Sequence, residues 1–163
     1  MTTRPASADH LDHAALPVQA KLAAAWTSFM LLYVYVDYFH LYKPGTIDGI
    51  SNGVVFEFDI SPALMTGFLA LIAIPSLMVM LSMTLRPRAS RAVNLIVASL
   101  YVPVTVFNAV GESWEWAAFY ALSIGLELAI LAVILRSAWA WPRAATGATG
   151  ATNRRPAGAL QEG

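Results

Sequence analysis

Four long apolar runs make up most of this 163-residue chain, and they limit its possible folds more than any other feature. Each run has about 20 residues or more, enough to cross ~30 Å of hydrocarbon as a helix rising ~1.5 Å per residue. Lipid offers the backbone no hydrogen-bond partners, so such segments must be helical. The sequence therefore predicts an all-α polytopic membrane protein, a four-transmembrane-helix bundle over residues 18–142, with spans at about 18–42, 62–85, 90–111 and 115–141.

The overall composition supports a lipid environment. Hydrophobic residues make up 58% of the chain and charged residues only 12%, whereas about a quarter of the residues in a soluble domain are charged. The net charge of zero argues against a nucleic-acid surface, so no nucleic acid is expected as a partner. The chain has no cysteine, which excludes thiolate metal sites and cysteine nucleophiles.

The two ends of the chain are polar. Residues 1–17 hold prolines, aspartates and histidines, and residues 143–163 are rich in Gly, Ala and Thr, so both are predicted to be disordered tails. Basic residues gather in the tails and in the 86–91 connection, whereas the other two connections are mainly acidic. The positive-inside rule then places both termini in the cytoplasm.

Polar side chains share one helical face, at 100° per residue, on three of the four runs. They are Trp26, Tyr33, Asp37 and His40 on the first run, Asn94, Tyr101, Thr105, Asn108 and Glu112 on the third, and Trp116, Tyr120, Ser123 and Glu127 on the fourth. Lipid would not tolerate these groups, so the three faces are expected to meet in a polar interior. Counting turns places most of them in the outer half, which predicts an outward-facing cleft that ends at Glu127.

Glu127 is the strongest candidate for function, because a charged carboxylate at the bilayer centre costs about 2.5–3.5 kcal/mol on insertion scales. It needs a proton or a partner, and Tyr101 and Ser123 are the hydrogen-bond partners that we expect. The alternative is that Glu127 only joins helices through hydrogen bonds. The other candidate residues for ligand binding or proton coupling are Asp37, His40, Tyr33, Tyr101, Thr105, Asn108, Tyr120 and Ser123.

Asp37 and His40 lie three residues apart near the outer end of the first run. They can form an interfacial hydrogen-bonded pair, and two spacings do not define a metal centre, so no metal site is predicted. The sequence indicates no particular cofactor. The 43–61 connection alternates apolar and polar residues, so it can lie on the helix ends at the interface or form a lid over the cleft.

Small residues repeat every four positions on the side of the fourth run that faces away from Glu127. They are Ala117, Ala121, Gly125 and Ala129. Such a row lets backbones approach closely. Either the fourth helix packs on both sides within the bundle, or the row is the seam of a homodimer, or the row has no role, because alanine is a common residue.

The chain resembles a family of small four-helix bacterial membrane proteins known only as a domain of unknown function. The likeness covers about residues 20–142 and lies in Tyr33-x-Tyr35-x-Asp37 before Pro44-Gly45, in Ile74-Pro75, in the basic stretch from Arg86 through Arg91 to Asn94, and in Tyr120, Glu127 and Trp139-x-Trp141-Pro142. A looser likeness in size and span number is to the DoxX-like proteins. The resemblance implies a four-span protein of the inner (plasma) membrane and carries over no activity.

Three functions fit these features. The first is a non-enzymatic protein that binds a small apolar or amphipathic ligand, or a partner subunit, in the cleft. The second is a proton-coupled transporter that uses Glu127. The third is an intramembrane enzyme that modifies a lipid or quinone, although the sequence contains no HExxH, GxSxG or phosphate-binding loop.

Overall fold

Four long helices form the body of the molecule, for which a computed structural model describes residues 16–108, 110 and 112–141. They are α1 (Val18–His40), α3 (Pro62–Thr84), α4 (Pro87–Phe107) and α5 (Ala117–Trp139). All four are long and apolar enough to cross a membrane, with α5 extended by the 3-10 turn Trp114–Trp116. The predicted all-α four-helix bundle is therefore confirmed. The predicted tails lie outside the described residues, apart from Leu16 and Pro17.

The helix bounds differ most from the predicted spans in the third helix. It begins at Pro87, three residues before the expected start, because proline fits the first turn of a helix and the basic residues that follow are themselves helical. It ends at Phe107, four residues before the expected end, where Asn108 caps it. The helices α1, α3 and α5 end one or two residues before their predicted limits.

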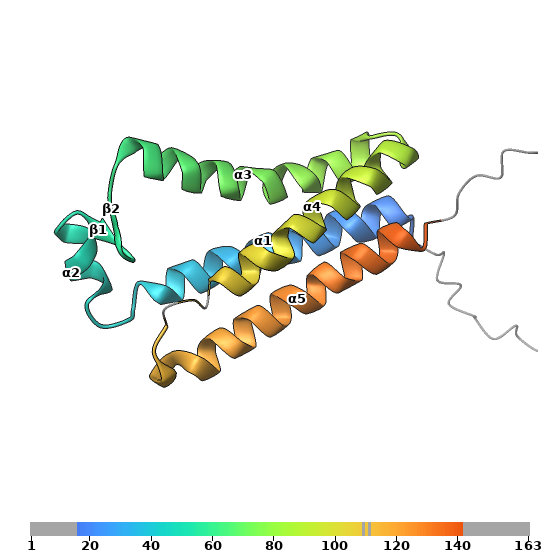
Figure 1. Cartoon of the computed structure of the whole chain (residues 1–163). Helices are drawn as coiled ribbons and strands as arrows, with labels where there is room; N and C mark the ends of the chain where they lie inside the picture. Colours follow the sequence, from blue (N-terminus) through green and yellow to red (C-terminus); the bar gives the residue numbers. More distant parts are fainter. Residues whose placement is uncertain (1–15, 109, 111, 142–163) are drawn as a thin grey trace, which may run out of the picture.

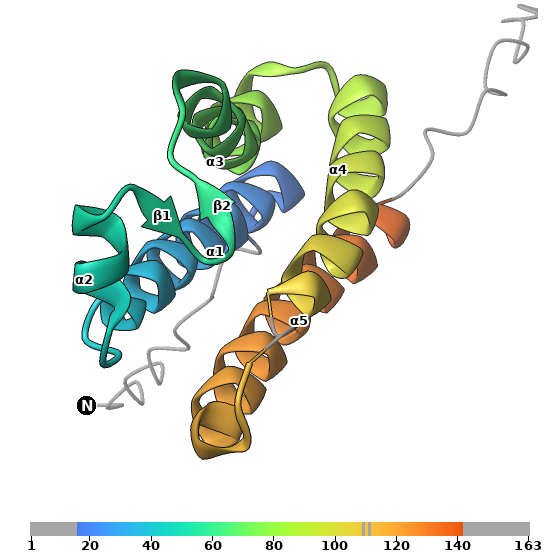
Figure 2. The same cartoon turned by 60° about the vertical axis from the view of Figure 1, so that its left-hand side comes forward.

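The helices pack in a ring, in which α1 contacts α3 and α5, and α4 contacts α5 and, less extensively, α3. The start of α1 and the end of α5 lie at one end of the bundle, together with the 85–86 connection (Figure 1). We call this the terminal end, and the opposite end, which holds residues 41–61, 110 and 112–116, the loop end. From the 85–86 connection, α3 and α4 diverge toward the loop end (Figures 1 and 2).

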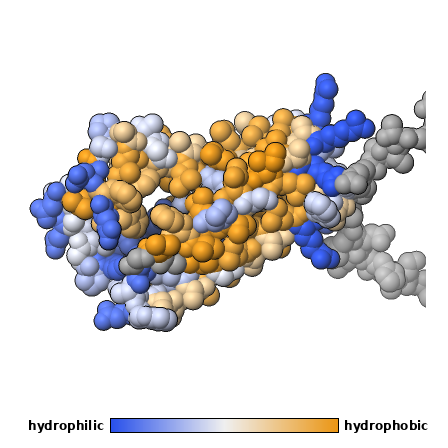
Figure 3. Space-filling model, in the orientation of Figure 1, coloured by the Kyte–Doolittle hydropathy of each residue, from blue (hydrophilic) through white to orange (hydrophobic). Residues whose placement is uncertain are grey.

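The surface has the banding of a membrane protein. Figure 3 shows a broad hydrophobic belt along the helices, with hydrophilic residues at both ends. Large apolar side chains such as Leu69, Leu100 and Leu122 are exposed on the long helices, where lipid would cover them. The view also shows the surface hollowed near the loop end, with hydrophilic residues visible between hydrophobic ones.

The packed core lies in the terminal half of the bundle. Its centre is an aromatic cluster in which Trp26 and Phe29 of α1 meet Tyr101 of α4, with ring centroids 5.7–6.3 Å apart and edge-to-face geometry. Leu22, Leu131 and Ile134 complete it without exposure. Edge-to-face aromatic pairs add about 0.5–1.5 kcal/mol beyond their buried area.

A proline in α3 explains one interhelical contact of this core. Pro75 has no N–H, so the carbonyl of Leu71, four residues earlier, loses its helical partner. The hydroxyl of Tyr101 donates to that carbonyl instead, which joins α4 to α3. The helix runs on through Pro75 because a neighbouring side chain satisfies the freed group.

The 43–61 connection folds over the loop end. It contains the short helix α2 (Thr46–Ser51) and a hairpin of β1 (Val54–Val55) and β2 (Phe58–Asp59), with Val54 opposite Asp59 and Val55 opposite Phe58. At the turn, Phe56 has a φ of 54°. This conformation is unusual for a bulky residue, so the surrounding contacts must hold it.

Candidate ligand-binding site

The polar faces of α1, α4 and α5 turn toward one another in the loop half of the bundle. Of the nine candidate residues, Tyr33, Tyr101, Thr105, Tyr120, Ser123 and Glu127 are buried, His40 and Asn108 are half-buried, and Asp37 is exposed. Three helices therefore contribute polar groups to one region, as their shared polar faces predict. Tyr101 stands apart from the others, because its hydroxyl is directed to α3.

Glu127 lies at the floor of this region and is only 1% exposed. Its Oε2 accepts a hydrogen bond of 3.0 Å from the hydroxyl of Thr105 on α4. The predicted partners, Tyr101 and Ser123, are wrong: the hydroxyl of Ser123 donates to the carbonyl of Tyr120 on its own helix. Short hydroxyl side chains in a helix commonly form such local bonds, and the tyrosine is held by the carbonyl that Pro75 frees.

The second carboxylate oxygen of Glu127 differs from the first in its contacts. Oε1 has no hydrogen-bond partner among the described residues, where every fully buried side-chain nitrogen or oxygen does have one. Oε1 must therefore border accessible space. Asp37 lies close enough for its charge to act on Glu127, and the Asp37 side chain makes no hydrogen bond within the described part of the chain. Two carboxyl groups thus share this region without a basic partner.

A chain of polar contacts spans the loop end above this site. Lys43 forms a salt bridge with Glu112, whose other oxygen accepts a hydrogen bond of 2.7 Å from the hydroxyl of Tyr120. That hydroxyl lies 2.8 Å from Nδ1 of His40. Because the hydroxyl has one hydrogen and gives it to Glu112, Nδ1 of His40 must be the donor in the second contact. We call these four residues the loop-end clamp; they join the end of α1 to the start of α5.

The electrostatics of the clamp favour an ionised Glu112. Burial alone would raise the pKa of this carboxyl, but hydrogen bonds from Lys43 and Tyr120 and the positive charge of Lys43 outweigh it, so the pKa of Glu112 lies below its usual range. The Lys43 ammonium also lies 5.9 Å from the ring centroids of Trp116 and Tyr120. Both rings can add cation–π attraction.

The hairpin touches the clamp through Phe56, whose ring centroid lies 5.0 Å from that of His40. The positive φ of Phe56 therefore presents its ring to the end of α1. His40 does not pair with Asp37, as one prediction had it, because Tyr120 occupies its Nδ1. No three His, Asp or Glu side chains come together as a metal-binding group in the part of the chain that the structure describes.

Residues 17–145 match a family of unknown function, DUF6326, and these residues include all four helices and the site. The chain belongs to DUF6326. No curated protein and no solved structure matches it. The resemblance to an uncharacterised four-helix family is thus confirmed, whereas the likeness to DoxX-like proteins and a bacterial origin stay predictions.

A second polar network lies in the terminal half of this DUF6326 protein. Of its members, only Trp26 and Asn94 belong to the polar faces that the sequence predicts. The indole N–H of Trp26 donates to Oδ1 of Asn94 over 2.7 Å, and the hydroxyl of Ser82 donates to the same oxygen over 3.2 Å. The Asn94 amide donates to the carbonyl of Ser90, and the Ser90 hydroxyl donates to the carbonyl of Ser82. Two of these members, Ser82 and Ser90, were missed, because isolated serines in an apolar run give no periodic signal.

The row of small residues on α5 faces away from the neighbouring helices of the bundle. Ala121, Gly125 and Ala129 are exposed, and a side chain built at Gly125 would meet no atom within 4 Å. The alternative in which α5 packs on both sides within the bundle is therefore wrong. The homodimer stays a prediction.

Proposed function

We propose that this protein is a non-enzymatic membrane protein that binds an amphipathic small molecule in the polar region between α1, α4 and α5. The observation that carries the proposal is Glu127, a carboxyl group 1% exposed whose Oε1 has no partner among the described residues. An unsatisfied acceptor of this kind in a membrane interior is costly. A ligand that donates a hydrogen bond or brings positive charge would remove that cost.

The charges of the region indicate the chemistry of the ligand. Asp37 lies close enough for its charge to act on Glu127, and Lys43 of the loop end is paired with Glu112. A cationic polar group, such as a primary amine, would neutralise this pair of carboxylates. The ring of Tyr33 packs against that of the buried core residue Phe29, with centroids 5.8 Å apart, so the polar region ends against the apolar core.

Two features of the fold favour entry from the loop end. Asp37 is exposed there, and α3 and α4 diverge toward that end (Figure 2). The hairpin and the loop-end clamp lie across the same end, so we propose that they act as a lid, which is one of the two roles that the sequence allows for residues 43–61. Opening would require the contact between Phe56 and His40 to separate.

The distribution of charge supports a proposed orientation. Lys21, Arg86, Arg88, Arg91 and Arg136 lie at the terminal end, whereas the loop end carries Asp48, Glu57, Asp59 and Glu115. The positive-inside rule would place the terminal end in the cytoplasm of a cell whose plasma membrane holds the protein. The site would then open to the outside.

The test is the identity of what stays bound. Native mass spectrometry of the protein, released from a mild detergent that preserves bound lipids, should show an added mass that fragments to an amine-containing amphiphile. Glu127→Gln should lose that mass, whereas the matched control Glu115→Gln, which removes an exposed carboxylate at the loop end, should keep it. Empty wild-type protein under these conditions would contradict the proposal.

A proton-coupled transporter is the second candidate, favoured by the burial of Glu127 itself. The terminal half counts against it, because the aromatic cluster and the Asn94 network fill the path to the other side. Uptake by proteoliposomes would need both a substrate and a proton gradient, and Glu127→Gln should abolish it. Uptake that Glu127→Gln leaves unchanged would remove this residue from any transport mechanism.

A further inference from the structure

Two grooves run along the terminal end of α5, one on each side of the helix. The first, of about 620 Å³, lies between α4 and α5 and is lined by Leu95, Ser99, Leu135, Arg136, Trp139 and Ala140. The second, of about 380 Å³, lies between α1 and α5 and is lined by Val18, Lys21, Val133, Arg136, Ser137 and Ala140. Arg136 and Ala140 belong to both grooves, so α5 forms the ridge between them.

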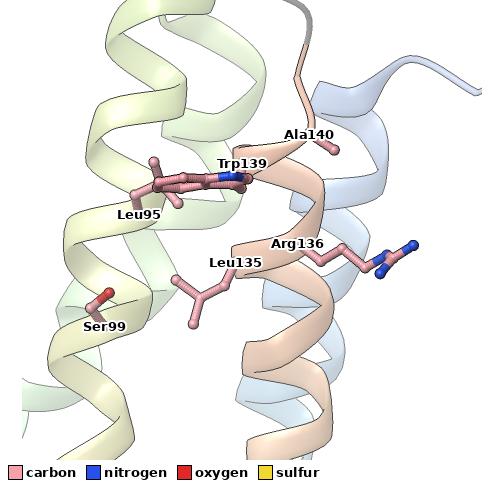
Figure 4. Close-up of a pocket in the computed structure, with 6 residues that line it drawn as sticks. All are labelled: Leu95, Ser99, Leu135, Arg136, Trp139 and Ala140. Carbon is pink, nitrogen blue, oxygen red and sulfur yellow. The ribbon is translucent and has the colours of Figure 1, made fainter.

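The first groove is open and mainly apolar. Leu95 and Leu135 point into it, and the Trp139 ring lies across the space between α4 and α5, while the Arg136 side chain points away toward α1 (Figure 4). Arg91 of α4 fixes this geometry, because its side chain donates to the carbonyls of Ala138 and Trp139 over 3.1 Å and 3.3 Å. An interfacial tryptophan above aliphatic side chains is typical of a surface that contacts acyl chains.

The second groove carries the positive charge. Lys21 and Arg136 both line it and both are exposed, and neither takes part in a salt bridge within the described part of the chain. Lys21 lies about one turn after the start of α1, and Arg136 lies about one turn before the end of α5. Both charges are therefore at the depth where lipid headgroups lie. Ser137 adds a hydroxyl on the same side. Basic residues between helices at this depth are suited to anionic headgroups.

We propose that an anionic phospholipid binds astride the terminal end of α5, with its phosphate at Arg136 and Lys21 and an acyl chain in the groove under Trp139. The chemistry of both grooves fits one molecule: the charge is at the headgroup level, and the apolar surface of Leu95, Leu135 and Val133 continues toward the membrane centre. This lipid site is separate from Glu127 and does not depend on the function proposed for it.

The experiment measures thermal unfolding of the detergent-purified full chain, titrated with phosphatidylglycerol or with phosphatidylcholine of the same acyl chains. Phosphatidylglycerol should raise the unfolding midpoint at a lower concentration than phosphatidylcholine. The double variant Lys21→Gln/Arg136→Gln should weaken the apparent affinity for phosphatidylglycerol at least tenfold, and the conservative pair Lys21→Arg/Arg136→Lys should retain it. Native mass spectrometry of the same samples should show a matching loss of bound phosphatidylglycerol.

The matched control is Arg86→Gln/Arg88→Gln, which removes two exposed positive charges from the same end of the bundle. It should keep the affinity of the wild type. Equal losses in the control and the Lys21/Arg136 variant would overturn the proposal, since general surface charge would then explain the binding. Glycerol 1-phosphate should not stabilise the protein, and stabilisation equal to that by phosphatidylglycerol would overturn the role of the acyl groove.

Discussion

The hydroxyl of Thr105 lies 3.0 Å from Oε2 of Glu127, and both side chains are almost fully buried between α4 and α5. A single neutral donor thus holds one half of a carboxyl group whose other half has no partner among the described residues. The site is polar at the loop end and closed at the terminal end by the network around Asn94. This asymmetry is why we favour binding from one side over passage through the bundle.

Thr105→Val removes the hydroxyl while keeping the shape of the side chain. We expect it to lower the free energy of unfolding by about 0.5–2 kcal/mol, because the buried carboxyl of Glu127 loses a donor. Thr66→Val is the control, since Thr66 is exposed and bonds only the carbonyl of Pro62 on its own helix. Thermal unfolding in detergent measures both, and equal effects at the two positions would show that the Thr105 bond adds nothing.

Asn94→Leu should be more damaging. The Trp26 indole and the Ser82 hydroxyl both donate to Oδ1 of Asn94, so the variant leaves two buried donors unpaired, at about 1–3 kcal/mol each. Asn52→Leu, at an exposed position, should change stability by less than about 0.5 kcal/mol. Unfolding by denaturant measures the difference. A similar result for both variants would mean that the network does not stabilise the terminal half.

The loop-end clamp predicts a dependence of stability on pH. The pKa of Glu112 lies below its ordinary value of 4.5 in the folded chain, so ionised Glu112 stabilises the protein at pH values above 4.5, and this contribution is lost as the pH falls through the lowered pKa. Glu112→Gln should therefore cost about 1–2 kcal/mol at neutral pH and progressively less in acid. Melting curves from pH 7 to pH 3 test this, and a cost independent of pH would contradict it.

The absence of cysteine makes accessibility easy to measure. Asp37→Cys should react with a charged, membrane-impermeant thiol reagent in intact vesicles that expose the loop end, because the Asp37 side chain is exposed on the polar face. Leu122→Cys is the control, since Leu122 is 66% exposed but on the apolar belt, where lipid excludes the reagent. An Asp37→Cys variant as inert as Leu122→Cys would show that water does not reach the site.

The sequence predicts the helices well because each polar face and each apolar run is a local pattern. Asp37, Thr105 and Glu127 fall on the facing sides of their helices from spacing alone. The predicted start of the second span at residue 62 is the start of α3, where Ser61 accepts a hydrogen bond from the Leu64 amide. The turn at Phe56 in the 43–61 connection could not be predicted from the sequence. Phe56 at positive φ is not a residue that turn preferences would select.

Partner choice across helices could not be read from the sequence, because it depends on backbone groups that local patterns do not show. Tyr101 was expected to meet Glu127, but the carbonyl freed by Pro75 takes its hydroxyl. His40 was paired with Asp37 on spacing, whereas a residue 80 positions away, Tyr120, bonds it. Ionic partners such as Lys43 and Glu112 come from two separate connections, and only the packing of α1 beside α5 brings them together.

Photoaffinity labelling tests the ligand site most directly. A long-chain primary amine carrying a diazirine, added to the protein in lipid nanodiscs, should label peptides of α1 around Tyr33–Asp37 and of α5 around Tyr120–Glu127. The label should be lost in Glu127→Gln, retained in Glu115→Gln, and absent when a carboxylate of the same chain length replaces the amine. Equal labelling by the amine and the carboxylate, or undiminished labelling of Glu127→Gln, would contradict a cation-binding site at Glu127.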